Sequence, residues 1–192
     1  MKIPLSTYRL QLTPAFGFQA CERILAYLSS LGISHVYASP VLKAKAGSTH
    51  GYDVVDPTRL NPDLGTVEDF ERLAEKVHCA SMGWLQDIVP NHMAYDSDNH
   101  ILMDILEKGP FSRYADFLDI EWDHAYETLK QKVLVPFLGK LYAQSLESGE
   151  IQLQYDEAGV YVRYYELRLP IRIESYLDVF MFRMEELQQA LG

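Results

Sequence analysis

The first 92 residues alternate between short strand patterns and amphipathic helical patterns. Residues 8–12 alternate apolar and polar side chains, which predicts a strand, and residues 35–39 and 84–89 predict two more. Between these strands, residues 19–31 and 66–77 place their apolar side chains on one helical face. Because strands joined by crossover helices run parallel, this order predicts a parallel sheet with right-handed connections.

Local signals set the expected ends of these elements. Gly32 and Gly83 each stand where the preceding helix is expected to stop. The run Thr66-Val67-Glu68-Asp69 resembles a capping box, with Asp in the position usually held by Glu. Residues 41–53 are expected to form a polar loop after the second strand.

Two parallel architectures fit the pattern. A dinucleotide-binding half-sheet lacks support, because no G-x-G-x-x-G follows the first or second strand. A (β/α)₈ barrel carries its chemistry on the loops after the strands, and polar and aromatic residues do gather after strands two and three. Such a barrel needs about 250 residues, and three strands cannot close. The chain is therefore either an incomplete barrel or not a barrel.

The second half departs from this rhythm. Residues 151–155 and 160–165 alternate around Asp156-Glu157-Ala158-Gly159, which predicts a hairpin. Residues 176–191 predict a final helix, whose expected buried side consists of Leu177, Phe180, Met181, Met184, Leu187 and Leu191. We therefore expect an α/β chain in which residues 1–95 form about three βα units and residues 96–192 form an α+β insertion subdomain.

Composition excludes several classes of partner. The chain has 17 Lys and Arg against 27 Asp and Glu, a formal net charge of −10, so neither nucleic acid nor an anionic membrane is expected as a partner. The start lacks the apolar core of a signal peptide, and no stretch approaches the ~20 apolar residues of a membrane span. Cys21 and Cys79 lie far apart and outside any C-x-x-C, so we expect a reduced, cytoplasmic protein.

The candidate site residues follow the second and third strands. Residues 47–53, GSTHGYD, combine a stacking ring with hydrogen-bonding groups, which suits a sugar; a structural turn with a packed Tyr is the alternative. Asp87 is expected inside the third strand, where a carboxylate facing a packed layer needs a cation or several donors. His92 would reach the mouth of a barrel, although a satisfied core His gives the same pattern, and the Asp-to-His spacing has no metal meaning.

Together these segments resemble a known family. STYRLQL (6–12), YLSSLGISHVYASPVLKAKAGSTHGYDVVDPTRLNPDLGT (27–66) and DIVPNHMA (87–94) are similar to the opening of the α-amylase superfamily of glycoside hydrolases. Within it they most resemble the malto-oligosyltrehalose synthases, the (1→4)-α-D-glucan 1-α-D-glucosylmutases. The similarity continues through short segments of the second half and covers essentially the whole chain.

The resemblance implies roles for matching positions. Tyr52 would stack under the glucose at the cleavage subsite, and His92 would hydrogen-bond its primary hydroxyl. Asp87 would accept a hydrogen bond from an Arg on the fourth strand. Asn91 matches a calcium-binding position of many amylases, but no metal is expected in this branch. His50 and Asp53 lie in the same loop as Tyr52 and are expected to contact the sugar.

The implied substrate is a malto-oligosaccharide or another α-1,4-glucan, without a cofactor. The family reaction turns the reducing-end α-1,4 linkage into an α,α-1,1 trehalose linkage by intramolecular transglycosylation. The catalytic carboxylates follow later strands; Arg172-Ile173-Glu174 and Arg183-Met184-Glu185 carry Glu where Asp is expected. Alone, the chain is expected to be inactive, with the remainder of its barrel as partner. A fragment of another α-amylase-type hydrolase and a non-catalytic glucan-binding remnant remain alternatives.

Overall fold

A computed structural model describes residues 3–157 and 159–181. The chain divides into two compact units, Met1–Asn99 and His100–Gly192. Each unit has its own sheet or sheets, and the two are described separately.

The first unit is built on a three-stranded sheet. Strands β1 (Thr7–Leu10), β2 (His35–Ala38) and β5 (Gly83–Gln86) are parallel and lie in the order β1-β2-β5. The predicted parallel sheet is therefore confirmed. The third strand ends earlier than expected, so Asp87 follows β5 and does not lie inside it. Among the described residues β5 pairs with β2 alone, and just after the paired stretch the Asp87 N–H donates to the Ala38 carbonyl at 2.9 Å.

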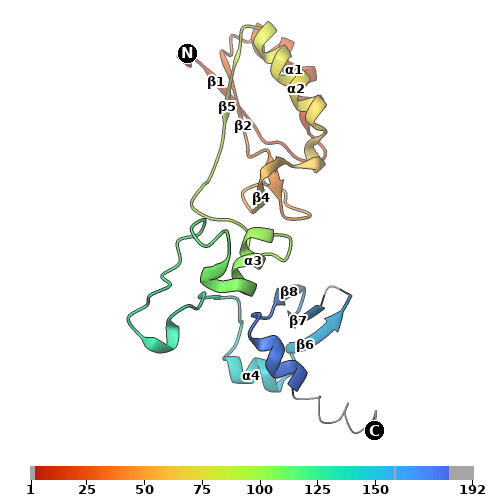
Figure 1. The fold of residues 1–192 in the computed structure, drawn as a ribbon. Helices are drawn as coiled ribbons and strands as arrows, with labels where there is room; N and C mark the ends of the chain where they lie inside the picture. Colours follow the sequence, from red (N-terminus) through yellow and green to blue (C-terminus); the bar gives the residue numbers. More distant parts are fainter. Residues whose placement is uncertain (1–2, 158, 182–192) are drawn as a thin grey trace. The chain divides into compact units, whose positions relative to one another are not determined.

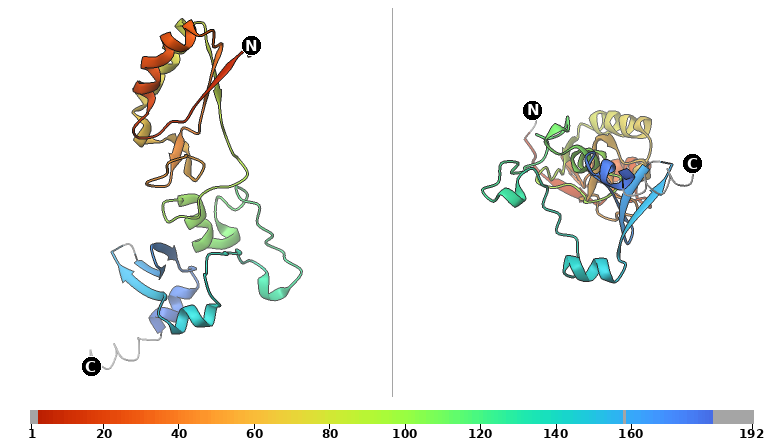
Figure 2. Two further views of the ribbon diagram at one scale, coloured as in Figure 1. Left: turned by 180° about the vertical axis from the view of Figure 1, so that it is seen from behind. Right: turned by 60° about the horizontal axis from the view of Figure 1, so that its bottom comes forward.

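Two helices cover one face of this sheet (Figures 1 and 2). Helices α1 (Phe18–Ser30) and α2 (Val67–Cys79) bury their apolar sides against it, as the periodicity predicts. Strand residues alternate between faces, so Val36 and Ala38 join this core while Arg9 and Tyr37 lie on the face without helices. The buried core consists of Leu10, Leu12, Phe18, Cys21, Leu25, Leu28, Val36, Ala38, Val41, Leu64, Leu73, Val77 and Met82.

The start of α2 is fixed by the expected capping box. The Thr66 hydroxyl accepts from the Asp69 N–H, and the Asp69 carboxylate accepts from the Thr66 N–H, both at 3.1 Å. Asp69 also accepts from Arg72 at 2.6 Å and from Gln19 of α1 at 3.1 Å. This one carboxylate therefore caps α2 and links the two helices.

The expected role of Gly83 as a helix stop is wrong. Helix α2 ends at Cys79, the chain turns at Ser81 with φ of 57°, and Gly83 begins β5. Glycine is needed there for space, because a Cβ would lie 2.2 Å from Cδ2 of His35 on the neighbouring strand. Gly32, by contrast, does follow the end of α1 and has φ of +83°, a conformation that glycine adopts without strain.

The polar loop expected at residues 41–53 is wrong in part. Strand β3 (Leu42–Ala44) lies within it and pairs antiparallel with β4 (Val54–Leu60), forming a second, two-stranded sheet. A 3-10 helix, Pro62–Leu64, then leads to α2. Sequence periodicity missed this pairing because β3 is only three residues long and its register is irregular. The true loop is the segment that joins β3 to β4.

The second unit combines short helices with an antiparallel sheet. Its elements are α3 (His100–Lys108), 3-10 helices at Gly109–Phe111 and Glu127–Leu129, α4 (Tyr142–Glu147), β6 (Ile151–Asp156), β7 (Gly159–Tyr164) and β8 (Leu167–Pro170). The predicted hairpin is confirmed by the pairing of β6 with β7. A third strand, β8, which the sequence patterns did not predict, pairs with β7.

The last helical segment begins at residue 175 and continues to residue 181, where the described part of the chain ends. Leu177, Phe180 and Met181 are each more than half exposed, so their expected burial is wrong. This segment contacts β7 through Tyr176, whose hydroxyl donates to the Val160 carbonyl at 3.4 Å. Met184, Leu187 and Leu191 lie outside the described residues. In the part of the chain that is described, no helix is long and apolar enough to span a bilayer.

Candidate functional site

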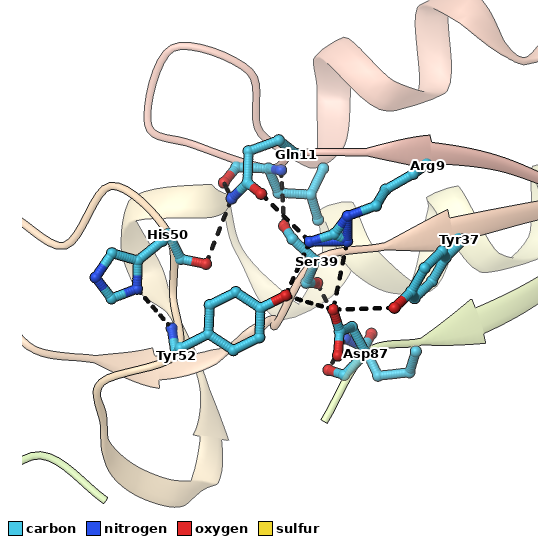
Figure 3. A network of polar contacts seen from close by, with 9 residues as sticks. Arg9, Gln11, Tyr37, Ser39, His50, Tyr52 and Asp87 are labelled. Atoms are coloured by element: carbon cyan, nitrogen blue, oxygen red, sulfur yellow. Dashed lines mark hydrogen bonds and ion pairs between the residues drawn. The ribbon is translucent and has the colours of Figure 1, made fainter. Parts of the chain in front are cut away.

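A polar network lies at the carboxyl ends of the three parallel strands, on the face without helices (Figure 3). The loop between β3 and β4 brings Tyr52 to this edge, and Asp87 arrives directly after β5. Strands β1 and β2 contribute Arg9 and Tyr37, which stand opposite each other in the sheet register. Four chain segments thus meet at one carboxylate.

Asp87 is the centre of the network. Its Oδ2 accepts from the Tyr52 hydroxyl at 2.5 Å, from the Tyr37 hydroxyl at 3.2 Å and from Arg9 Nη1 at 3.3 Å. The Asp87 side chain is only 14% exposed. The cation and donors that a largely buried carboxylate requires are therefore present. They come from β1, β2 and the β3–β4 loop.

Tyr52 is held through its phenolic oxygen. Besides donating to Asp87, that oxygen accepts from Arg9 Nη2 at 2.9 Å. The hydrogen bond to Asp87 is the main cause that raises the pKa of the Tyr52 phenol, so the group stays protonated at neutral pH. The Tyr52 ring stacks on the His50 ring with centroids 5.9 Å apart and planes 25° apart. Since the ring is only half-buried, it offers an apolar surface beside fixed polar groups.

The loop that carries Tyr52 is built from glycine turns and short polar bonds. Gly47 and Gly51 have φ of +77° and +79°, which other residues adopt only with strain. At Gly51 an added Cβ would lie 3.1 Å from the Pro40 carbonyl oxygen, so the position also lacks space. The Ser48 hydroxyl donates to Asp53 and accepts from the Gly51 N–H. These contacts fix the path of the chain into Tyr52.

His50 and Asp53 lie in this loop as expected. The Nδ1 atom of His50 accepts from the Tyr52 N–H at 3.1 Å and lies 3.8 Å from the Asp53 carboxylate. The His50 carbonyl accepts from the Gln11 amide at 3.3 Å, which fastens the loop to the segment after β1. Both residues therefore shape the loop around Tyr52, and the His50 side chain remains more than half exposed.

Asn91 and His92 lie further along the segment after β5. Both are exposed, and their side chains hydrogen-bond each other at 3.1 Å. In the described part of the chain, the hydrogen-bonded network around Asp87 includes neither of them. The structure thus groups Tyr52, His50, Asp53 and Asp87 and leaves Asn91 and His92 outside that group.

The described residues contain neither a cluster suited to a metal ion nor a carboxylate placed for catalysis near Asp87. Within residues 3–157 and 159–181, no group of three or more His, Cys, Asp or Glu side chains could hold a metal ion. Glu174, the first of the two near-matches to a catalytic segment, is exposed in the second unit and forms an ion pair with Arg172 at 3.3 Å. The other near-match, Arg183 to Glu185, lies outside the described residues.

Sequence reasoning missed Arg9, Tyr37 and Gln11. A signal was present, because strand alternation puts Arg9 and Gln11 on the same face of the first segment. What it lacked was the register that sets Arg9 beside Tyr37 and the fold that brings Asp87 to both.

Comparison with known proteins identifies the family. Residues 20–165 match the model of the alpha amylase catalytic domain. A Mycobacterium tuberculosis (strain H37Rv) protein named as a maltooligosyl trehalose synthase is 38% identical over 174 residues, which cover 87% of this chain and 21% of that protein.

Solved structures give the same result. A maltooligosyl trehalose synthase crystal structure matches with a TM-score of 0.76 and 39% identity, covering 88% of this chain and 22% of that one. The maltooligosyltrehalose synthase of Arthrobacter ramosus matches with a TM-score of 0.76 and 36% identity, covering 90% and 22%. This chain spans about a fifth of the length of these relatives. It belongs to the family of the alpha amylase catalytic domain.

Proposed function

We propose that this chain is the N-terminal part of a malto-oligosyltrehalose synthase and forms one wall of its glucan-binding pocket. The observation that carries the proposal is identity of 38% that extends over 87% of the chain, including both units. In this proposal β1, β2 and β5 are the first three strands of a (β/α)₈ barrel, and residues 96–192 form an insertion after the third. The remainder of the barrel is the partner that completes the sheet.

The position of the polar network supports the barrel assignment. In (β/α)₈ enzymes the active site lies at the carboxyl ends of the strands. Tyr52 and Asp87 lie at that end of the sheet, on the face that helices α1 and α2 leave uncovered. A closed barrel would also pair the outer edges of β1 and β5, which otherwise expose unpaired backbone groups.

The proposed substrate is a malto-oligosaccharide. Tyr52 presents a half-buried ring on which the apolar face of a glucose can stack, and its phenolic oxygen is held by Asp87 and Arg9. His50 and Asp53 border the ring, and His92 and Asn91 supply exposed donors and acceptors beyond it. Ring and polar groups together suit recognition of sugar hydroxyls.

The proposed reaction moves the terminal α-1,4 bond to an α,α-1,1 bond within one molecule. A retaining mechanism needs two carboxyl groups about 5–5.5 Å apart, one protonated and one ionised. We assign neither carboxyl group to this chain. Asp87 accepts hydrogen bonds from three donors, so we give it a structural role in holding the pocket wall together. The task of the wall is to hold the sugar and to exclude water, because water would divert the reaction to hydrolysis.

We propose that the protein acts in the cytoplasm and that its reaction needs no cofactor. Cys21 and Cys79 are both free, which fits a reducing compartment. The formal net charge of −10 disfavours nucleic acid and anionic membranes as partners.

Affinity electrophoresis tests the binding part of the proposal. The 192-residue chain is run through native gels with and without soluble starch, beside Tyr52→Ala and Tyr27→Ala. Tyr27 is an exposed tyrosine on α1 and serves as the matched control. We expect starch to retard the unmodified chain and the control but not Tyr52→Ala. Equal retardation of all three proteins would remove Tyr52 from the site, and no retardation of the folded chain would contradict the glucan-binding wall.

A further inference from the structure

We propose that Arg9 is the positioning residue of this sugar site, fixing the Tyr52 ring and the Asp87 carboxylate relative to each other. The inference rests on the proposed function, because it assigns a role within the same site. It concerns a residue of the first strand that sequence patterns did not mark. Figure 3 shows Arg9 reaching from β1 to Tyr52 and Asp87.

The two terminal nitrogens of Arg9 contact two different residues. Nη1 donates to Asp87 Oδ2 at 3.3 Å, and Nη2 donates to the Tyr52 hydroxyl oxygen at 2.9 Å. Since Tyr52 itself donates to the same Asp87 oxygen at 2.5 Å, the three groups close a ring of contacts. A guanidinium is planar and rigid, so it fixes both the distance and the direction between its two acceptors. Any displacement of the Tyr52 phenolic oxygen from this position must lengthen or break at least one of these bonds, so the tip of the side chain is held in place.

Arg9 is itself held in place by its strand neighbours. Its guanidinium carbon lies 4.9 Å from the centroid of the Tyr37 ring, opposite it in the register of β1 and β2. Gln11, on the same side of the chain as Arg9, accepts from Nη2 at 3.5 Å and donates to the His50 carbonyl at 3.3 Å. The guanidinium therefore sits between a cation–π contact and a polar link to the Tyr52 loop.

Arg9 also provides the positive charge that pairs with Asp87. Asp87 is a largely buried carboxylate, and its ion pair in the described part of the chain is with Arg9. The family resemblance implies a further Arg from a later, fourth strand; among the described residues, the first strand supplies a cation through Arg9. Without Arg9, Asp87 would keep its phenol donors but lose its counter-charge. The carboxylate would then be held by the two phenols alone, and the contact that fixes Tyr52 from its other side would be lost.

Tyrosine NMR tests the inference without any sugar. The full 192-residue chain is labelled with ¹³Cζ-tyrosine, and the Tyr52 resonance is assigned by its loss in Tyr52→Phe. We expect Arg9→Met to shift the Tyr52 resonance and to raise the midpoint of its titration, because a nearby cation lowers the pKa of the phenol. Arg23→Met removes an exposed arginine of α1 and should leave Tyr52 unchanged.

The conservative variant separates positioning from general stability. Lysine keeps the charge but cannot donate through a planar fork, so Arg9→Lys should restore the titration midpoint of Tyr52 while its resonance stays displaced. Arg9→Lys also provides the comparison if Arg9→Met fails to fold. An unmoved Tyr52 resonance in a folded Arg9 variant would overturn the inference.

A sugar titration then connects position to binding. In the same samples, we expect the dissociation constant for maltoheptaose to rise about tenfold in Arg9→Met and to stay unchanged in Arg23→Met. If the unmodified chain binds no maltoheptaose, the proposed function fails, while the sugar-free spectra still decide the role of Arg9. Unchanged affinity in an Arg9→Met protein with a displaced Tyr52 resonance would overturn the inference for sugar binding.

Discussion

The phenolic oxygen of Tyr52 should contribute measurably to the stability of the first unit. Tyr52→Phe keeps the ring and removes the hydrogen bond to Asp87 at 2.5 Å and the one from Arg9 at 2.9 Å. A hydrogen bond to a charged group contributes about 1.5–3 kcal/mol. Asp87 and Arg9 keep each other and Tyr37, and the site is partly open to water, so the lower end applies. We predict a loss of about 1.5 kcal/mol.

Urea unfolding at neutral pH and high dilution measures this loss. The chain has two tryptophans, and Trp122→Phe leaves Trp84 of β5 as the only one. Trp84 packs edge-on against Phe70 of α2 with ring centroids 5.9 Å apart, so its fluorescence reports on the first unit alone. In this background, Tyr52→Phe is compared with Tyr27→Phe, which changes an exposed tyrosine of the same unit.

A double-mutant cycle with Asp87→Asn isolates the contact itself. Because the two residues touch, their coupling energy should exceed about 0.5 kcal/mol. The reasoning is refuted if Tyr52→Phe unfolds at the same urea concentration as Tyr27→Phe. A coupling energy near zero would also refute it, since the destabilisation would then arise elsewhere.

Three other predictions follow from the geometry. Arg72, Thr66 and Gln19 lower the pKa of Asp69 from 3.8 to about 2; the unfolded chain therefore binds more protons in this window, and stability should fall as pH falls from about 4 to about 2. Asp69→Asn should flatten that dependence in urea midpoints measured against pH, and an unchanged slope would contradict it. Gly83→Ala, whose Cβ would collide with His35, should cost about 1–3 kcal/mol in the same unfolding assay, and a neutral effect would contradict the steric reason. The unpaired sheet edges and exposed apolar side chains should make the mean mass in sedimentation rise with concentration, whereas a monomer with a sharp two-state melt would contradict this.

Local sequence patterns predicted the elements that depend on neighbours along the chain. The faces of α1 and α2, the Thr66 capping box and the β6–β7 hairpin are set by residues a few positions apart, and each is confirmed. The alternation of strands and helices then restricts the sheet to a parallel one, because a crossover helix returns the chain in the same direction.

Sequence patterns failed for features that depend on a residue far away along the chain. Strand β5 stops before Asp87 because β2, its neighbour in the described part of the chain, ends at Ala38. Gly83 is required by the imidazole of His35, which lies on another strand, and not by the helix before it. β3 exists only through its pairing with β4. The spacing of residues along the sequence does not show which strands lie next to each other in the fold.

The candidate site divides in the same way. Tyr52 was predicted from its place after the second strand and Asp87 from its expected place inside the third, and the structure brings the two side chains into contact. Arg9 escaped notice because a charged residue in a strand is informative only once the register shows what lies beside it. The site is thus a product of sheet register as much as of motif.

The most direct test of the central claim is the fate of reducing ends in maltoheptaose. The gene is sequenced beyond codon 192 in all three forward frames, and the polypeptide it encodes is assayed together with its Tyr52→Ala variant. We expect reducing ends to disappear without chain shortening, because an α,α-1,1 linkage leaves no free anomeric hydroxyl. We also expect Tyr52→Ala to slow this loss. An increase in reducing ends would mean hydrolysis and would contradict the proposed mutase reaction. A continuation that encodes no further barrel strands would contradict the proposal that this chain forms one wall of an enzyme's glucan-binding pocket.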